Sequence, residues 1–203
     1  WIYTKTGYRD KAKEIYDRVL LKAKELKDEN SEAFLLKNIG NLFLDNDDDK
    51  ALVYYNKALK LFKLIDNKEG IAMTQNNIGI VYDKKCNYDK AMELYQENYN
   101  IHKEIGSLSG MGHALMQMGW VYRTIGDCDL AIKFIARSIS IFEKNKDYFQ
   151  QGLAFNSLGY TYQAKGDYDK SIEYFKKSIR IEERVGNNDG LALIFYNIGR
   201  TYY

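Results

Sequence analysis

The sequence predicts an all-α fold in which antiparallel helix hairpins stack into a solenoid. Three observations predict it: a motif that recurs along the 203 residues, helical spacing of apolar residues around it, and turn residues between the helical segments. The motif is centred on a glycine, which recurs at steps of 39, 40, 40 and 40 residues as Gly40, Gly79, Gly119, Gly159 and Gly199. A repeat of this length indicates stacked supersecondary units, each of which buries its apolar face against a neighbour.

Further landmarks recur in register with the glycine. An aromatic residue follows it by three positions, as Phe43, Tyr82, Tyr122, Tyr162 and Tyr202. A small residue comes later in each unit, as Ala12, Ala51, Ala91, Ala131 and Ser171. An aromatic residue follows the small one by four positions at Tyr16, Tyr55, Tyr95 and Phe175. Because these landmarks keep their spacing while other positions vary, we interpret them as packing residues.

Each unit predicts two helices. In residues 70–84, small and apolar side chains recur at three- and four-residue spacings, which is typical of a helix with one buried stripe. A second stripe that begins at residue 88 predicts the second helix. The glycine costs about 1 kcal/mol relative to alanine inside a helix, so we expect it to allow the second helix to approach closely.

Glycine and aspartate predict the turns. The sequences G-D-C-D at residues 126–129 and G-D-Y-D at residues 166–169 combine a glycine, which adopts the left-handed conformation at a helix end, with an aspartate that caps the next helix. Asp129 and Asp169 then fall in a first helical turn, where the helix dipole favours carboxylates. The linker at residues 145–150 lacks the glycines of the other linkers, so we expect a longer second helix there. Tyr148 and Phe149 would then be partly exposed.

These hairpin landmarks resemble the tetratricopeptide repeat, and the resemblance covers essentially the whole chain. The long units are similar to the elongated subtype of kinesin light chains, Leu-Gly-Asn repeat proteins and bacterial peptide-sensing regulators. The chain differs from the family in having no proline. HEAT-type arrays have a similar period but not this glycine and aromatic spacing. The resemblance implies a right-handed α-solenoid whose first helices line the concave side.

We expect a single array over residues 1–203. Its units would lie near residues 30–69, 70–109, 110–149 and 150–189, with partial units at residues 1–29 and 190–203. Counting back from Ala12 places Tyr3 at the aromatic landmark, so the chain would open inside a helix, and it would close inside one after Tyr202. We interpret the sequence as part of a longer chain, because half-hairpins expose apolar faces that capping units cover in full arrays.

Composition limits the functional classes. Hydrophobic residues make up 45% and charged residues 29% of the chain, as in soluble folded proteins, and no apolar run reaches the roughly 18 residues of a membrane helix. The net charge of +2, with lysines that alternate with acids on the second helices, does not predict a nucleic-acid footprint. Cys86 and Cys128 lack disulfide or metal spacing, so we expect free thiols in a reducing compartment, the cytoplasm.

The resemblance implies that a partner segment lies along the first helices, so the varied residues beside each glycine are the candidate contacts. Helical register gathers them on one face. The candidate protein-binding or peptide-binding residues are Lys37, Asn38, Asn41, Asn76, Asn77, Met116, Gln117, Trp120, Arg123, Asn156, Tyr160, Tyr196, Asn197 and Arg200.

The chemistry of this set suits an extended peptide. An asparagine amide carries both donors and an acceptor, so a row of amides satisfies the main chain of a peptide without reading its side chains. Apolar and aromatic anchors would come from Met116, Trp120, Tyr160 and Tyr196. The two arginines would pair with acidic groups. The alternative interpretation is structural: the asparagines bridge adjacent helices, and the aromatic residues pack between units.

The sequence contains part of a carboxylate-binding motif found in the family. Lys37, Asn41 and Asn77 match part of the carboxylate clamp by which some family members hold the chain end of a chaperone. The next unit has His113 and Gln117 where the remaining clamp cations would fall. The clamp is therefore incomplete, and we do not favour a chaperone-tail function.

The sequence contains no catalytic constellation. Its two histidines, His102 and His113, lie on different predicted helices without metal-ligand spacing. The acidic run at residues 45–49 resembles the start of a calcium loop, but Lys50 and Asn56 stand where that loop needs glycine and a closing glutamate. We therefore expect no metal, no cofactor and no enzymatic activity.

We interpret the chain as a non-catalytic scaffold whose concave groove binds a peptide or protein segment, with no nucleic-acid or membrane partner. One alternative is the sensor or regulatory region of a larger signalling enzyme, such as a histidine kinase. Another is a structural role in which the open end repeats form a homodimer.

Overall fold

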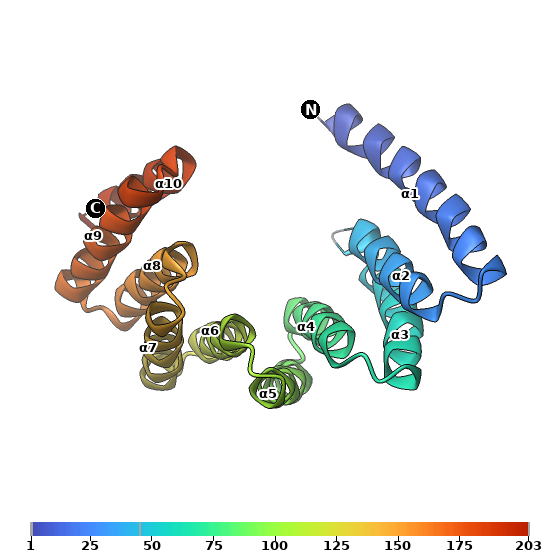
Figure 1. The fold of residues 1–203 in the computed structure, drawn as a ribbon. Helices are drawn as coiled ribbons and strands as arrows, with labels where there is room; N and C mark the ends of the chain where they lie inside the picture. Colours follow the sequence, from blue (N-terminus) through green and yellow to red (C-terminus); the bar gives the residue numbers. More distant parts are fainter. Residues whose placement is uncertain (1, 45, 203) are drawn as a thin grey trace. The chain divides into compact units, whose positions relative to one another are not determined.

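The computed structural model describes the backbone of residues 2–44 and 46–202, and the side chains of residues 9–44, 46–187 and 190–202. The described backbone forms helices and contains no strand (Figure 1). The helices are α1 (Ile2–Glu25), α2 (Glu29–Phe43), α3 (Asp48–Leu64), α4 (Lys68–Lys84), α5 (Tyr88–Glu104), α6 (Leu108–Thr124), α7 (Cys128–Lys144), α8 (Tyr148–Lys165), α9 (Tyr168–Val185) and α10 (Asn188–Tyr202). None of them is long and apolar enough to cross a membrane within the described residues.

The chain forms two compact units, Trp1–Ile101 and His102–Tyr203, here called unit 1 and unit 2. In unit 1, α2 packs against α1 and α3, and α3 packs against α4. In unit 2, α7 packs against α6 and α8, and α9 packs against α8 and α10. The predicted all-α architecture of helix hairpins is confirmed. We call α2, α4, α6, α8 and α10 the glycine helices, because each carries one of the repeated glycines.

The repeated glycines bring the two helices of a hairpin together. A Cβ atom at Gly79 would lie 2.6 Å from a ring carbon of Tyr95, and one at Gly159 would lie 2.4 Å from a ring carbon of Phe175. Ordinary van der Waals contacts begin near 3.4 Å, so a side chain does not fit at either position. At Gly199 the same Cβ would meet nothing within 4 Å. The predicted close approach is therefore confirmed at the hairpins within each unit.

The predicted turns are also confirmed. Gly126 has a φ of +90° and Gly166 a φ of +83°, so both adopt the left-handed conformation that glycine tolerates. The side chains of Asp127 and Asp167 accept the backbone N–H groups three residues later and cap the helices that follow. Each turn thus satisfies one of the backbone donors that the start of a helix leaves without a partner.

The expectation of a longer second helix at residues 145–150 is wrong. Helix α7 has 17 residues, as α5 does, and ends before this linker. Lys146 takes the left-handed conformation that glycine takes elsewhere, with a φ of +56°, and the side chain of Asp147 accepts the backbone N–H of Gln150. The left-handed residue Lys146 thus follows the end of α7 in place of a glycine, and Asp147 caps the start of α8. Tyr148 and Phe149 are partly exposed, as expected.

Most of the partial unit expected at residues 1–29 is one helix, α1. Helix α1 continues through residues 2–25 without a turn between Tyr3 and Ala12. Later second helices begin after an aspartate or asparagine, such as Asp47 and Asn87, whose side chain accepts a backbone N–H. Tyr8 occupies that register in the first unit. Without a carboxylate to cap a new helix, the helical hydrogen bonds continue. The side chain of Tyr3 lies outside the described residues.

Candidate protein-binding surface

The glycine helices carry all of the predicted contact residues. In unit 1, α2 carries Lys37, Asn38 and Asn41, and α4 carries Asn76 and Asn77. In unit 2, α6 carries Met116, Gln117, Trp120 and Arg123, α8 carries Asn156 and Tyr160, and α10 carries Tyr196, Asn197 and Arg200. Their environments divide them into residues that join neighbouring helices, residues buried in the core, and residues whose polar groups are not used internally.

Asn41 and Asn77 bind each other. The Nδ2 of Asn77 donates to the Oδ1 of Asn41 over 2.8 Å, and the same oxygen accepts the hydroxyl of Tyr55, also at 2.8 Å. Tyr55 is fully buried, so this oxygen joins α2 to both α3 and α4. The structural interpretation of these two asparagines is therefore the one that the geometry favours, and the clamp-like trio with Lys37 has its amides engaged internally.

Unit 2 joins its glycine helices in a similar way. The Nε1 of Trp120 on α6 donates to the Oγ of Ser157 on α8 over 2.9 Å. The Nε2 of Gln163 donates to the Oγ1 of Thr201 on α10 over 3.1 Å. Trp120 also packs against the core of the unit. Its main role in the described structure is to hold α6 and α8 together, although the side chain stays partly exposed.

Four candidate amides make no hydrogen bond to another described residue. They are Asn38 and Asn76 in unit 1 and Gln117 and Asn156 in unit 2, and all four are half-buried. The Oδ1 of Asn156 is buried without a partner. A buried amide normally finds a hydrogen-bond partner, because leaving it without one costs free energy. These four side chains are therefore suited to bond the main chain of a second molecule.

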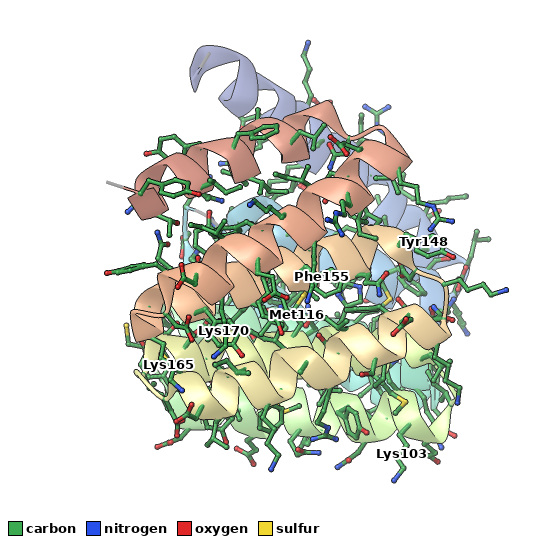
Figure 2. All side chains as sticks on the ribbon, turned by 90° about the vertical axis from the view of Figure 1, so that its left-hand side faces the viewer. Lys103, Met116, Tyr148, Phe155, Lys165 and Lys170 are labelled. Atoms are coloured by element: carbon green, nitrogen blue, oxygen red, sulfur yellow. The ribbon has the colours of Figure 1, made fainter. Side chains whose placement is uncertain are left out.

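Two candidates are too deeply buried to offer much surface. Met116 is 3% exposed and belongs to the core cluster of unit 2, where Phe155 packs nearby (Figure 2). Asn197 is 2% exposed, and its Nδ2 has no hydrogen-bond partner in the described residues. The helical register alone did not reveal this burial, because the same positions in other units, Asn76 and Gln117, are only half-buried.

Two cations on the glycine helices are partly desolvated. Lys37 is 8% exposed, burial lowers its pKa, and its Nζ lies 5.6 Å from the centre of the Phe34 ring. Burial likewise lowers the pKa of Arg123, whose guanidinium lies 5.7 Å from the centre of the Tyr160 ring. Neither cation makes an ion pair with a described residue. Each is therefore available to an anion of a partner.

The last glycine helix carries the most exposed aromatic candidate. Tyr196 is 63% exposed, and the guanidinium of Arg200 lies 6.0 Å from the centre of its ring. Tyr160 is less exposed and packs edge-on against Phe175, with ring centres 5.4 Å apart. Tyr160 on α8 is therefore mainly a packing residue, whereas Tyr196 on α10 is exposed to a partner.

Sequence reasoning did not select Asp83 or the ion pairs between hairpins. Burial raises the pKa of Asp83, which lies 40 residues before Arg123 in the same register of the repeat. Lys84 pairs with Asp48 at 2.8 Å in unit 1, and Lys165 pairs with Asp129 in unit 2. Both pairs span 36 residues. A lysine and an aspartate 36 residues apart in successive units are therefore the sequence signal for these ion pairs.

The described residues contain no grouping suited to a metal ion. No three His, Cys, Asp or Glu side chains are placed to hold a metal ion there. His102 is on α5 and His113 on α6, and burial lowers the pKa of His113. Cys86 is exposed and Cys128 half-buried, and both are free.

Comparison with known proteins identifies the repeat. The family model described as tetratricopeptide repeat matches residues 70–144 and 150–203, which is more than half of the chain. No match was found among curated protein sequences.

Solved structures share the fold at low sequence identity. BtubC (BKLC) from P. vanneervenii is 16% identical with a TM-score of 0.82, and the alignment covers 96% of this chain and 83% of that one. A Rap protein solved in complex with competence and sporulation factor is 16% identical with a TM-score of 0.78, over 98% of this chain and 61% of that one. A kinesin light chain repeat protein from Podosopora anserina is 16% identical with a TM-score of 0.68, over 92% of both chains.

Proposed function

The chain belongs to the tetratricopeptide repeat family, and from this premise we propose that it is a non-catalytic scaffold that binds a peptide or protein segment along its glycine helices. The fold and the family support a role in protein interaction. The Rap protein of the same fold was solved in complex with a second molecule, which supports binding as a use of this architecture.

The observation that carries the proposal is the set of half-buried amides without internal partners, Asn38, Asn76, Gln117 and Asn156. They lie two or three positions before successive glycines. Each amide offers two donors and one acceptor, which is the complement of a peptide N–H and C=O. An extended segment that runs past the two amides of one unit would form main-chain hydrogen bonds to side chains that are already partly removed from water.

Charge and aromatic groups would add selectivity. Lys37 and Arg123 are partly desolvated cations, so each favours a carboxylate of the bound segment. Tyr196 supplies an exposed ring beside Arg200. Because each of these groups lies on a helix of its own unit, little backbone entropy is lost at that position when a partner binds.

A selected peptide tests the proposal. A ligand would be taken from a random phage-displayed peptide library, and its affinity for the 203-residue chain measured by titration calorimetry. We expect Asn76→Ala with Asn156→Ala to weaken binding by about 5- to 150-fold, since each of the two lost hydrogen bonds contributes about 0.5–1.5 kcal/mol. The melting temperature should stay nearly unchanged, because neither amide bonds a described residue.

Asn77→Ala is the matched control. It removes an amide next to Asn76, but one that bonds Asn41 internally. We expect a small loss of stability and little change in affinity. Equal affinity of the parent chain and the double variant, or a large drop in melting temperature for the double variant, would refute the assignment of the four amides.

A homodimer through the end of the array is a second candidate, favoured by α10. Its side chains Leu193, Phe195, Tyr196 and Tyr202 are each more than half exposed. Light scattering at several protein concentrations tests this, and a constant monomer mass would exclude it. The comparisons do not favour the sensor region of a signalling enzyme. We place the scaffold in the cytoplasm because its two cysteines are free.

A further inference from the structure

Unit 1 contains a cleft that the proposed function does not use. It lies between α1 and α3, with α2 packed against both helices. Its volume is about 480 Å³, which falls in the range of roughly 300–1,000 Å³ typical of small-molecule sites. We call it the α1–α3 cleft. Figure 1 shows these three helices in sequence at the N-terminal end of the chain.

The floor of the α1–α3 cleft is apolar. Leu20 from α1, Leu36 from α2 and Leu61 from α3 line it. All three belong to the apolar cluster that also contains Phe62, which is fully buried. A hydrocarbon or aromatic group placed in the cleft would therefore be removed from water against a packed core. Burial of apolar area is worth about 25 cal/mol per Å², so such a group would gain affinity in proportion to its size.

The two acidic residues of the cleft are already paired. Asp17 pairs with Lys13 at 2.5 Å, and Glu32 pairs with Lys24 at 3.7 Å. Each carboxylate therefore has a cation beside it, so each pair adds almost no net charge to the cleft.

Two lysines of the cleft have no counter-charge. Lys57 and Lys60 lie three residues apart on α3, which places them on the same face of the helix. Neither makes an ion pair with a described residue, and the Nζ of Lys57 lies 5.6 Å from the centre of the Tyr54 ring. The rim along α3 therefore carries an excess positive charge above an apolar floor.

We propose that the α1–α3 cleft binds a small amphipathic carboxylic acid, with its apolar body on the leucine floor and its carboxylate between Lys57 and Lys60. An ammonium group bonds a carboxylate more strongly than it bonds a neutral acceptor. This site is independent of the glycine helices and does not rest on the peptide-binding proposal.

Methyl NMR of the 203-residue chain tests the proposal with sodium decanoate as the probe, at concentrations below micelle formation. We expect saturable shifts confined to the methyl groups of Leu20, Leu36 and Leu61. The double variant Lys57→Gln with Lys60→Gln should bind decanoate at least tenfold more weakly, because both ammonium groups are lost. Both lysines are exposed, so the variant should keep the parent's circular dichroism spectrum.

Lys63→Gln is the matched control, since Lys63 is exposed on α3 but does not line the cleft. Its affinity should equal that of the parent, and decanol should bind much more weakly than decanoate. An absence of saturable shifts would overturn the proposal. So would an equal loss of affinity in Lys63→Gln, which would indicate non-specific attraction, or an equal affinity for decanol, which would show that the charge is not recognised.

Discussion

Gly159→Ala tests the packing role of the repeated glycine most directly. The added methyl carbon would lie 2.4 Å from Cε1 and 2.5 Å from Cδ1 of Phe175, at least 0.9 Å inside the ordinary contact distance of 3.4 Å. The ring has little freedom to move, because it is fully buried and packs edge-on against Tyr160. Helices α8 and α9 must therefore separate, or the ring must leave its preferred rotamer.

Two opposing terms set how much Gly159→Ala changes the free energy of unfolding. Overpacking of a close core contact costs about 1–3 kcal/mol. Alanine is favoured over glycine inside a helix by about 1 kcal/mol. The steric term is the larger one at this distance, so we expect a net loss of up to about 2 kcal/mol in the free energy of unfolding of unit 2.

Urea unfolding provides the assay, followed by far-UV circular dichroism and by the fluorescence of Trp120 in a Trp1→Phe background. Trp120 lies in unit 2 and reports on the affected helices. Two probes are needed because repeat arrays do not always unfold in one step.

Gly199→Ala is the matched control, because it has the same register but a Cβ there meets nothing within 4 Å. Only the propensity term remains, so this variant should be neutral or up to about 1 kcal/mol more stable. Gly119→Leu extends the test, since even the first added carbon would lie 2.6 Å from Ile135, and it should destabilise by about 1–3 kcal/mol or more. If Gly159→Ala or Gly119→Leu unfolded at the same urea concentration as the parent, the packing argument would fail.

Three further predictions concern single side chains. Ser157→Ala should destabilise unit 2 by about 0.5–1.5 kcal/mol, because the partly buried indole N–H of Trp120 loses its acceptor. Urea unfolding measures this, and an unchanged midpoint would contradict it. Burial lowers the pKa of His113 below its unfolded value, so the unfolded state binds more protons as the pH falls below about 6.5, and stability should decrease on acidification. His113→Gln should remove that part of the pH dependence in melts between neutral and mildly acidic pH, and an unchanged slope would refute the assignment. Lys37→Met should raise the melting temperature at neutral pH, because it replaces a buried cation without an ion pair by an apolar chain of similar length; a lower melting temperature would indicate that Lys37 has a stabilising partner.

Much of the fold follows from local sequence patterns. The caps at Asp127 and Asp167 need only an acceptor three residues before a backbone N–H. Such short-range rules are readable in a sequence without knowledge of the fold. The same rules explain the failure at residues 145–150, where Asp147 caps the helix although no glycine precedes it.

The candidate site was less predictable, because register gives a face of a helix but not its surroundings. Met116 was predicted to be an apolar anchor, and the structure places it in the core cluster of unit 2. Asn41 and Asn77 were predicted as peptide contacts, and the structure adds a hydrogen bond between them that register could not reveal. The α1–α3 cleft had no signal in the sequence, since its lining comes from three helices whose packing must be known first.

The sequence by itself determined the repeat, the alternation of helices, the caps and the positions where hairpin helices approach closely. Each of these depends on interactions within a few residues or on a steric rule that returns in every unit. Only the tertiary structure decided which polar side chains are used internally and which remain for a partner. The physical reason is that a bond such as Asn77 to Asn41 joins residues 36 positions apart, so it forms only after successive hairpins have stacked and set the distance between their side chains.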